Sequence, residues 1–327
     1  MQLIVRRPRH YHVSQDIVEE LESAILRDMR VTPARMNRVV KAGVTAVAGV
    51  IARAGLGSGA FPGARRRSAP VDGPDYFAVM MNLAAAPLAP WFSRAARKSV
   101  YIFDAWPAMH RSITRFVADW GVQYAFVSSR QGAERLAPVS ESCTFIWVPE
   151  GVDPARYQRR PASERDVDVL QLGRKYDAHH ELIAPALERG GKRYLFENEK
   201  GTLVFPGREQ LSEGLARSRI SICVPSSITH PARAGDIETM TVRYLQSMAS
   251  KCLLLGHAPA EMIDLFGYNP VIEIEMDRAA DQVLDLLADY DSYLPMIERN
   301  FSLVRSEHTW DKRWERMSSL LFPHRAT

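Results

Sequence analysis

Basic and hydroxyl side chains gather where the sequence predicts the carboxyl ends of buried strands. Arg174 and Lys175 come just after the apolar run 167–172, and the polar loop 226–239 comes just after the apolar run 220–224. A guanidinium can bind a phosphate through two parallel hydrogen bonds, and the N–H groups at a helix N-terminus attract anions. Ligands of open α/β sheets bind outside the carboxyl ends of the strands. This spacing therefore predicts a site for a phosphorylated ligand in the second half of the chain.

Asp104 and His110 place acid–base groups near another predicted strand end. Asp104 directly follows the apolar run 100–103, and His110 comes shortly after it. A carboxylate can act as a general base, and a neutral imidazole can donate or accept a hydrogen bond. Each residue also has an ordinary structural interpretation, as a helix cap for Asp104 and as a surface side chain for His110. His10 follows the predicted first strand and is a weaker candidate.

Apolar runs alternate with helical patterns along most of the chain. Near-continuous apolar strands separated by helices are typical of a parallel sheet that is covered on both faces. Strands are predicted at 3–5, 76–80, 100–103, 124–127, 145–148, 167–172, 193–196, 202–205, 220–224, 252–255 and 271–274. Predicted helices include 112–120, 178–189 and 297–321, with Pro33 in the first turn of another helix at 33–54. We expect an α/β protein with two doubly wound, Rossmann-like units.

A polar segment in the middle of the chain predicts a domain boundary. The turn cluster 149–154 and the polar segment 157–166 interrupt the apolar pattern. Segments of this kind join domains because few contacts cross them. We therefore expect a first domain at 1–160, a second at 161–300, and a C-terminal helix in 301–327 that packs back on the first domain.

The composition is that of a globular protein of 327 residues, with 46% hydrophobic and 24% charged residues. The cysteines Cys143, Cys223 and Cys252 lie in apolar runs without metal-ligand spacing, and their odd number favours a reducing cytoplasm over a disulfide framework. The adjacent His179 and His180 cannot face one metal ion from a helix. We expect no signal peptide, and no apolar run reaches the ~18 residues that a membrane span needs.

Positive charge is concentrated in the first third of the chain. Residues 1–100 hold 15 Lys/Arg against 7 Asp/Glu, whereas the remainder holds 27 against 31. Residues 33–67 combine an apolar run with basic residues and a Gly-rich loop, which suits peripheral contact with an anionic membrane. A packed helix followed by a solvated basic loop would give the same pattern. Nucleic acid is not an expected partner, because the basic residues are not interleaved with aromatic residues.

Several short motifs of the second half occur in the order found in GT-B glycosyltransferases. Residues 149–154 are similar to that family's interdomain Pro-x-Gly-Val-Asp turn, and Gly173-Arg174 to the Gly-Arg that opens its donor domain. Pro225-Ser226 is similar to the strand that ends in Pro-Ser, and Glu238 and Gln246 fall on the Glu-x7-Glu spacing. Over roughly residues 145–320 the chain resembles the retaining family-4-like group, and Arg243 to Gln246 resembles the Arg-x-Phe-Glu of its spore-maturation (CgeB-like) branch.

This resemblance implies a GT-B fold, in which two Rossmann-like domains face a cleft and a C-terminal helix crosses back to the first domain. It implies a cytoplasmic hexosyltransferase that moves a sugar from a nucleotide-sugar donor to a glycan or lipid-linked acceptor, with retention, no cofactor and no metal. The implied catalytic residues are Glu238, on the donor sugar hydroxyls, with His110 and Asp104, the latter as a base if configuration inverted. The implied donor-binding residues are Arg174, Lys175, Arg208, Ser226, Ser227, Thr239, Arg243 and Gln246.

Two departures from the family pattern keep other functions open. Gln246 stands where the family has a second glutamate, although an amide can still bind hydroxyl groups. His179 and His180 occupy the region of an expected lysine, whose charge Lys175 or Arg208 could supply. The alternatives are a non-catalytic GT-B-like module that binds a glycan or a partner, and a nucleotide-sugar epimerase of the same fold.

Overall fold

The structure, a computed structural model, describes residues 1–5, 13, 15–53, 73–81, 83, 86–173, 175–199 and 202–323. Arg174, His10 and the basic loop 54–67 lie outside these residues. The chain forms two compact units. The first consists of Met1–His10, Val18–Pro149 and Trp314–Thr327, and the second of Tyr11–Ile17 and Glu150–Arg313.

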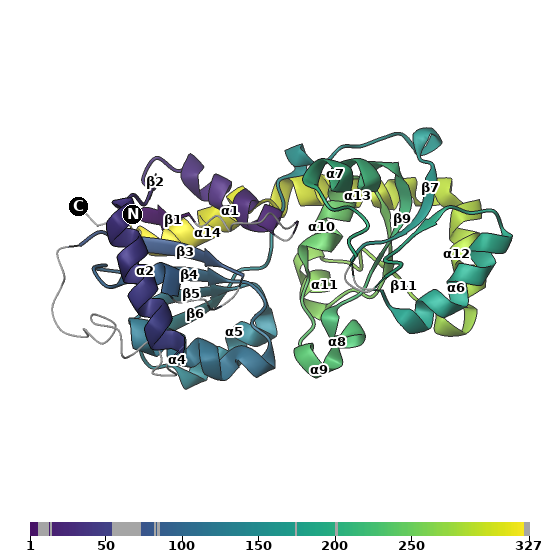
Figure 1. Ribbon diagram of the computed structural model, residues 1–327. Helices are drawn as coiled ribbons and strands as arrows, with labels where there is room; N and C mark the ends of the chain where they lie inside the picture. The colour runs from purple at the N-terminus through teal and green to yellow at the C-terminus, as the bar shows by residue number, and fades with distance from the viewer. Residues whose placement is uncertain are drawn as a thin grey trace. The chain divides into compact units, whose positions relative to one another are not determined.

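The first unit is built on a parallel sheet of six strands in the order β2-β1-β3-β4-β5-β6 (Figure 1). The strands are β1 (Gln2–Ile4), β2 (Thr32–Pro33), β3 (Tyr76–Met80), β4 (Lys98–Ile102), β5 (Tyr124–Val127) and β6 (Thr144–Trp147). Every neighbouring pair is parallel. Since β2 and β3 flank β1 on opposite sides, the sheet changes its direction of growth between β1 and β3.

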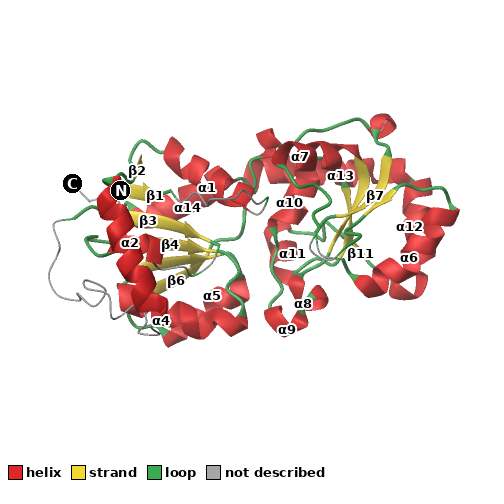
Figure 2. Cartoon of the chain, viewed as in Figure 1, coloured by secondary structure: helices red, strands yellow, loops and turns green. Residues whose placement is uncertain are grey.

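Helices cover both faces of this sheet (Figure 2). They are α1 (Gln15–Arg27), α2 (Arg38–Arg53), α3 (Ala89–Phe92), α4 (His110–Trp120), α5 (Arg130–Leu136) and α14 (Trp310–Leu321). Ala78 and Met80 of β3 share a core with residues of α2 to α5. Phe77, whose side chain points to the other face, meets Trp314 of α14 edge to face, with ring centroids 5.7 Å apart. Successive β3 side chains point to opposite faces of the sheet, and helices cover both faces. Apolar residues therefore occur at every position of this strand.

The second unit has a parallel sheet of five strands in the order β11-β10-β9-β7-β8. The strands are β7 (Val167–Gln171), β8 (Tyr194–Leu195), β9 (Ser218–Cys223), β10 (Leu253–Gly256) and β11 (Ile272–Glu273). Because β8 and β9 flank β7 on opposite sides, this sheet changes its direction of growth between β7 and β9. The predicted pair of doubly wound α/β units is confirmed.

Two helical layers enclose the second sheet. The helices are α6 (Asp177–Arg189), α7 (Arg208–Arg217), α8 (Ser226–Thr229), α9 (Pro231–Ala234), α10 (Val242–Ala249), α11 (Ala260–Phe266), α12 (Ala279–Ala288) and α13 (Leu294–Glu307). Residues of α7, α10 and α11 share one core, and residues of α6 and α12 share the other (Figure 1). At the end of β10, a Cβ on Gly256 would lie 1.7 Å from the Cys223 carbonyl oxygen, so glycine is required there.

The prediction of one helix over 297–321 is wrong, because α13 ends at Glu307 and α14 begins at Trp310. The break is made by the segment after Pro149. Val152 donates its backbone N–H to the His308 carbonyl and accepts the N–H of Trp310, both at 3.2 Å. These bonds hold the turn at residues 149–154, which is similar to the family's interdomain motif. In a continuous helix, the backbone carbonyl of His308 and the N–H of Trp310 would bond within the helix and could not bond to Val152.

The predicted strand at 202–205 is also wrong. Phe205 packs so closely on α7 that a Cβ on Gly214 would lie 2.1 Å from its ring, so this apolar run fills a side of the core and joins no sheet. Pro33 lies in the edge strand β2 and not in a helix, since α2 begins at Arg38. An edge position suits proline because it lacks an N–H, and the next residue, Ala34, donates to the Leu3 carbonyl at 2.8 Å.

Two histidines of the second unit, His179 and His308, are buried. Burial, reinforced by Arg313, lowers the pKa of His308 from 6.5 to about 3, and burial, reinforced by His180, lowers the pKa of His179 to about 4. The His308 Nδ1 atom lies 2.8 Å from Arg313 Nη2 and must accept its hydrogen bond, so a proton there would oppose a like charge.

We therefore expect the free energy of unfolding to decrease as the pH falls below about 6.5, since only the unfolded chain binds these protons readily. His179 alone accounts for about 3 kcal/mol between its two pKa values. Urea midpoints at about pH 7 and about pH 4.5 measure the effect. His179→Leu, which removes a buried imidazole, should reduce the difference; equal midpoints for the unaltered protein would contradict the expectation.

None of the helices in the described part of the chain has the length and apolar character needed to cross a bilayer.

Candidate functional site

Arg243 lies at the point where the second sheet changes its direction of growth. Its Nη1 donates to the Leu172 carbonyl at 3.0 Å, and its Nη2 donates to the Val224 carbonyl at 3.3 Å. Leu172 follows β7 and Val224 follows β9, so the side chain spans the carboxyl ends of the two strands. Doubly wound sheets bind their ligands at this switch point. The guanidinium has five N–H donors, more than these two bonds use.

Gly173 makes the approach of Arg243 possible. Its φ of +76° lies in the left-handed region, and a Cβ would lie 3.3 Å from Arg243 Nη1. Both the backbone conformation and the close approach favour glycine at this position. The glycine that opens the predicted phosphate loop is therefore needed to seat Arg243.

Arg243 and Gln246 also line a largely apolar cavity of about 310 Å³ within the second unit. Gln246 is buried, and its Nε2 donates to the Tyr157 hydroxyl at 2.9 Å, which fixes the orientation of the amide. The cavity is lined by Val13, Ile17, Leu172, Gly173, Glu197, Thr202, Leu203, Val204, Phe205, Leu211, Val242, Arg243 and Gln246. A cavity of this kind, with a few polar groups on apolar walls, has the character of a small-molecule site.

The N-terminus of α10 already carries an anion that belongs to the chain. The Val242 backbone N–H donates to the Glu150 carboxylate at 2.5 Å, and Glu150 is buried. A carboxylate is stabilised there by the helix dipole. The N–H of Val242, the first residue of α10, is therefore already bonded to Glu150. The positive charge of the site comes from Arg243, the next residue of the helix.

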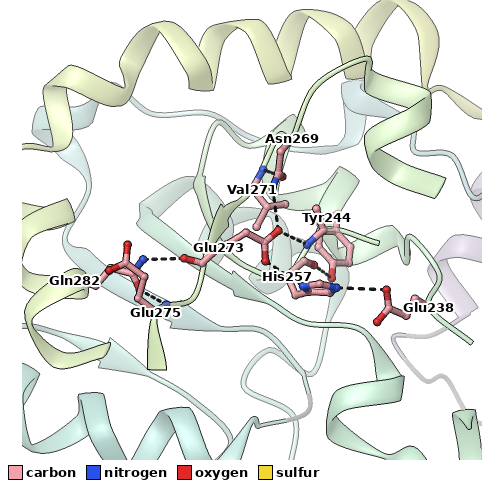
Figure 3. A network of polar contacts seen from close by, with 9 residues as sticks. Glu238, Tyr244, His257, Asn269, Val271, Glu273, Glu275 and Gln282 are labelled. Carbon is pink, nitrogen blue, oxygen red and sulfur yellow. Dashed lines mark hydrogen bonds and ion pairs between the residues drawn. The ribbon is translucent and has the colours of Figure 1, made fainter. Parts of the chain in front are cut away.

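Glu238 belongs to a polar network centred on His257 (Figure 3). His257 Nε2 lies 3.3 Å from Glu238 Oε2, and His257 Nδ1 lies 3.0 Å from Glu273 Oε2. Asn269 Nδ2 and the Ala258 N–H both donate to Glu273 Oε1, at 2.9 and 3.1 Å. These bonds hold Glu273 in place and present the imidazole to Glu238.

His257 lies between two carboxylates, with one ring nitrogen near each of them. A neutral imidazole has a single N–H, so it can donate to only one of the two carboxylates. Both contacts are hydrogen bonds at the same time only when the ring or one carboxyl group carries an additional proton. Tyr244 fixes the backbone beside the ring, because its hydroxyl donates to the His257 carbonyl at 2.8 Å. Burial raises the pKa of Tyr244 well above its usual value, so this hydroxyl stays protonated.

The loop before α10 is held by a second buried carboxylate. Glu261 Oε1 accepts the Thr239 hydroxyl at 2.9 Å and the Met240 N–H at 2.8 Å. Ser226 is buried at the start of α8. The hydroxyls of Ser227 and Thr241 are buried without a hydrogen-bond partner among the described residues. Such hydroxyls are costly in a folded protein, so each has capacity to bind a polar group of a ligand.

Two other predicted cations that the structure describes, Lys175 and Arg208, have acidic partners. Lys175 Nζ lies 3.6 Å from Asp177 Oδ1, and Arg208 Nη2 donates to the buried Asp16 at 2.7 Å. Arg208 thereby joins the start of α7 to the segment Tyr11–Ile17, which supplies part of the cavity wall.

Asp104 and His110 lie in the first unit, at the end of β4. Asp104 has a φ of +52°, a left-handed conformation that is rare for a residue with a side chain. Strained residues of this kind cluster at functional sites. His110 is the first residue of α4, and its Nε2 lies 3.0 Å from the Ala105 carbonyl. Because a carbonyl can only accept, Nε2 carries the proton, and the Nδ1 of a neutral ring is the acceptor.

Three solved structures show what the chain is similar to. Anabaena HepE in complex with UDP and glucose covers 98% of this chain and 98% of its own, with 8% identity and a TM-score of 0.59. WaaG, a glycosyltransferase involved in lipopolysaccharide biosynthesis, covers 98% of this chain and 99% of its own, with 10% identity and a TM-score of 0.54. TarM covers 76% of this chain, with 9% identity and a TM-score of 0.53, and the chain spans 55% of TarM. No protein-family model and no curated protein matches the sequence.

Full-length likeness to glycosyltransferases with two parallel α/β sheets decides the architecture. The fold is GT-B. Identities of 8–10% mean that the likeness concerns the fold. The predicted fold class and the resemblance to GT-B glycosyltransferases are both confirmed at this level.

His257 and Glu273 belong to the polar network around Glu238, and the sequence reasoning missed both. His257 directly follows β10, and Glu273 is the last residue of β11, the neighbouring strand. The rule that polar residues at the carboxyl ends of parallel strands meet would have found both. The carboxylates Glu150 and Glu261 were also missed, because they act across more than 20 residues on backbone N–H groups.

If the cavity that Gln246 lines holds a nucleotide, Gln246→Ala should weaken its binding by about five- to tenfold, because one hydrogen bond contributes about 1 kcal/mol. The turnover number should change little, since the amide lies in the cavity and not in the His257 network. Calorimetric titration with UDP and a parallel kinetic assay measure the two effects. Gln210→Ala, at an exposed position of α7, is the matched control. A loss of turnover with unchanged affinity would place Gln246 in a different role.

Proposed function

We propose that the protein is a glycosyltransferase that moves a sugar from a nucleotide-sugar donor to a glycan or lipid-linked acceptor. The position of Arg243 carries this proposal, since its guanidinium spans the ends of β7 and β9 at the switch point. A charged fork at that place fits the diphosphate of a nucleotide-sugar. The HepE structure with UDP and glucose supports the choice of a uridine nucleotide as the first donor to test.

In this proposal the donor binds to the second unit without a metal ion. Arg243 neutralises the diphosphate as the sugar departs, and Arg174 adds positive charge beside it. Lys175 and Arg208 contribute less, because they already pair with Asp177 and Asp16. Ser226, Ser227 and Thr239 offer hydroxyl groups on the loop before α10, where the Ser227 hydroxyl is buried without a partner among the described residues. Gln246 binds the hydroxyl groups of the nucleotide from the cavity wall.

Glu238 is the proposed catalytic carboxylate. It accepts hydrogen bonds from hydroxyl groups of the donor sugar, and His257, which lies 3.3 Å from it and is itself held by Glu273, keeps it oriented. These bonds strengthen if the sugar develops positive charge during a reaction that retains configuration. His257 is a positioning residue in this scheme, since it acts through Glu238.

The first unit is proposed to supply the acceptor side. His110 offers its Nδ1 to an acceptor hydroxyl, and Asp104 would serve as the base if the reaction inverted configuration. The left-handed conformation of Asp104 supports a functional role for this strand end. The domains at 1–160 and 161–300 would then correspond to acceptor and donor halves, with 301–327 returning to the first half. A cytoplasmic location belongs to the same proposal, and the free thiols of the three buried cysteines suit it.

Calorimetric titration with UDP-, GDP-, dTDP- and ADP-sugars tests the proposal. One of the four should bind with a dissociation constant of about 10⁻⁶–10⁻³ M, the range of ordinary enzyme substrates. No binding of any of them would contradict it.

A non-catalytic GT-B-like binding module is the second candidate, because a neutral Gln246 bonded to Tyr157 stands in place of an acid. Slow hydrolysis of the bound donor, detected as free sugar, would exclude this candidate. A nucleotide-sugar epimerase is a third candidate. Product analysis in the absence of an acceptor distinguishes it from a transferase, because an epimerase would change the sugar while the sugar stays attached to the nucleotide.

A further inference from the structure

A second cavity of the second unit lies at the amino ends of its strands. Its volume is about 580 Å³, which is in the range of small-molecule sites. Arg165, in its wall, comes two residues before β7, and Lys251 comes two residues before β10. Because these strands are parallel, their amino ends lie at the edge opposite to the carboxyl ends that Arg243 spans. The cavity is therefore separate from the site at Arg243.

The charged side chains of this cavity are mostly cationic. Five basic residues line it: Arg159, Arg160, Arg165, Lys251 and Arg305. Glu298 is the acidic residue of the wall, and it pairs with Lys251, while Arg160 lies 3.6 Å from Glu213. The other three cations have no carboxylate partner in the part of the chain that the structure describes. A concave surface with this excess of positive charge attracts anions.

Arg165 holds the walls of the cavity together and contributes a buried charge. It is only 4% exposed. Its Nε donates to the Arg160 carbonyl at 3.1 Å, its Nη2 donates to the Ser250 carbonyl at 2.7 Å, and its Nη1 donates to the Ser218 carbonyl. Carbonyl groups satisfy the N–H donors but do not cancel the charge. A buried charge without an opposite charge is costly, and a bound anion would offset that cost.

Lys251 has a backbone conformation that favours glycine. Its φ is +59°, and it directly follows Ser250, the residue that ends α10. Glycine is the usual residue at this position of a helix end. The Lys251 side chain extends over Phe301 with Nζ 4.7 Å from the ring centroid, and the Arg159 guanidinium lies 5.3 Å from the same centroid. One ring therefore holds two cations in the cavity, and the strained backbone supports a functional role for Lys251.

We propose that this cavity binds a soluble small molecule that carries two or more phosphate groups. Arginine binds phosphate oxygens through two parallel hydrogen bonds, and lysine binds them as a point charge. A single phosphate group carries a charge of about −2, which is less than the charge of the three unpaired cations. The volume of the cavity leaves room for the rest of such a molecule. The inference goes beyond the proposed transferase activity and does not depend on it.

Calorimetric titration of the full chain with inorganic pyrophosphate tests the inference, and inorganic phosphate at the same ionic strength is the comparison. We expect pyrophosphate to bind at least tenfold more tightly than phosphate, because it brings a second charged group to the same cations. Both affinities should fall as the salt concentration rises.

A pair of double variants assigns the binding to the cavity. Arg159→Gln/Lys251→Gln removes two charges from the wall and should weaken pyrophosphate binding at this site at least tenfold. Arg189→Gln/Arg278→Gln is the matched control, because it removes two charges from exposed positions of the same unit outside the cavity, and it should bind as the unaltered protein does. Circular dichroism and thermal melting establish that each variant is folded.

Three results would overturn the inference: no binding of pyrophosphate, equal affinity for phosphate and pyrophosphate, or a cavity variant that binds as tightly as its control. Arg243→Ala should keep the pyrophosphate site. A site that is lost in Arg243→Ala and kept in the cavity variant would place the pyrophosphate at the proposed donor site and contradict the inference. Co-sedimentation with phosphatidylglycerol vesicles that the cavity variant abolishes, without pyrophosphate binding, would assign these cations to a lipid surface instead.

Discussion

Arg243→Ala is expected to lower kcat/KM for sugar transfer by about a hundred- to a thousandfold, because it removes the charge proposed to meet the diphosphate. The loss of one partner from a desolvated charged hydrogen bond costs about 2–5 kcal/mol, and each 1.4 kcal/mol is a tenfold change. Affinity for UDP alone should fall by a similar factor, since the diphosphate is present in both ligands. Initial rates and calorimetry with the same donor measure the two losses.

Controls for this variant must separate binding from stability. Arg243 donates to carbonyl groups at the ends of β7 and β9, so the alanine variant is also expected to melt at a lower temperature. Arg243→Lys keeps a positive charge but loses the two-pronged geometry, and we expect it to recover only part of the affinity. Arg278→Ala, at an exposed arginine of the same unit, should leave activity unchanged. Normal UDP affinity in a folded Arg243→Ala protein would remove Arg243 from the donor site.

Glu238→Gln is expected to lower the turnover number by about ten- to a hundredfold with a smaller effect on donor affinity. The substitution preserves the shape of the side chain but removes the charge, and hydrogen bonds to a charged group contribute about 1.5–3 kcal/mol. The charge is needed most when the sugar becomes positively charged, which is why the effect should appear in kcat. Single-turnover kinetics with saturating donor measure the chemical step.

His257 gives this prediction a second readout. If the imidazole acts by orienting Glu238, His257→Gln should lower activity by about tenfold alone and by much less in the Glu238→Gln background. Additive losses in the double variant would show that His257 acts separately from Glu238.

Local patterns were sufficient to predict most of the strands. β3 and β5 have the predicted bounds, because apolar runs bounded by turns must lie in a sheet that is covered on both faces. The Gly-Arg loop led to Gly173, and the resemblance of residues 243–246 to Arg-x-Phe-Glu led to Arg243 and Gln246; the structure brings all three to one cavity.

The features that could not be predicted depend on contacts between distant parts of the chain. The break between α13 and α14 exists because His308 and Trp310 bond to Val152. Arg208 was predicted to bind the phosphate of the donor, but no local sequence pattern indicates its bond to Asp16, 192 residues away. Glu238 lies in the loop that follows β9 and His257 follows β10, so their pairing requires knowledge of the strand order, which places β9 and β10 side by side.

A crystal structure of the protein with UDP tests the central claim most directly. The account predicts the diphosphate at the switch point between β7 and β9, with its oxygens about 2.7–3.2 Å from the guanidinium nitrogens of Arg243. It also predicts the uridine ribose within hydrogen-bonding distance of Gln246. A nucleotide bound elsewhere on the chain, with Arg243 and Gln246 untouched, would contradict the account.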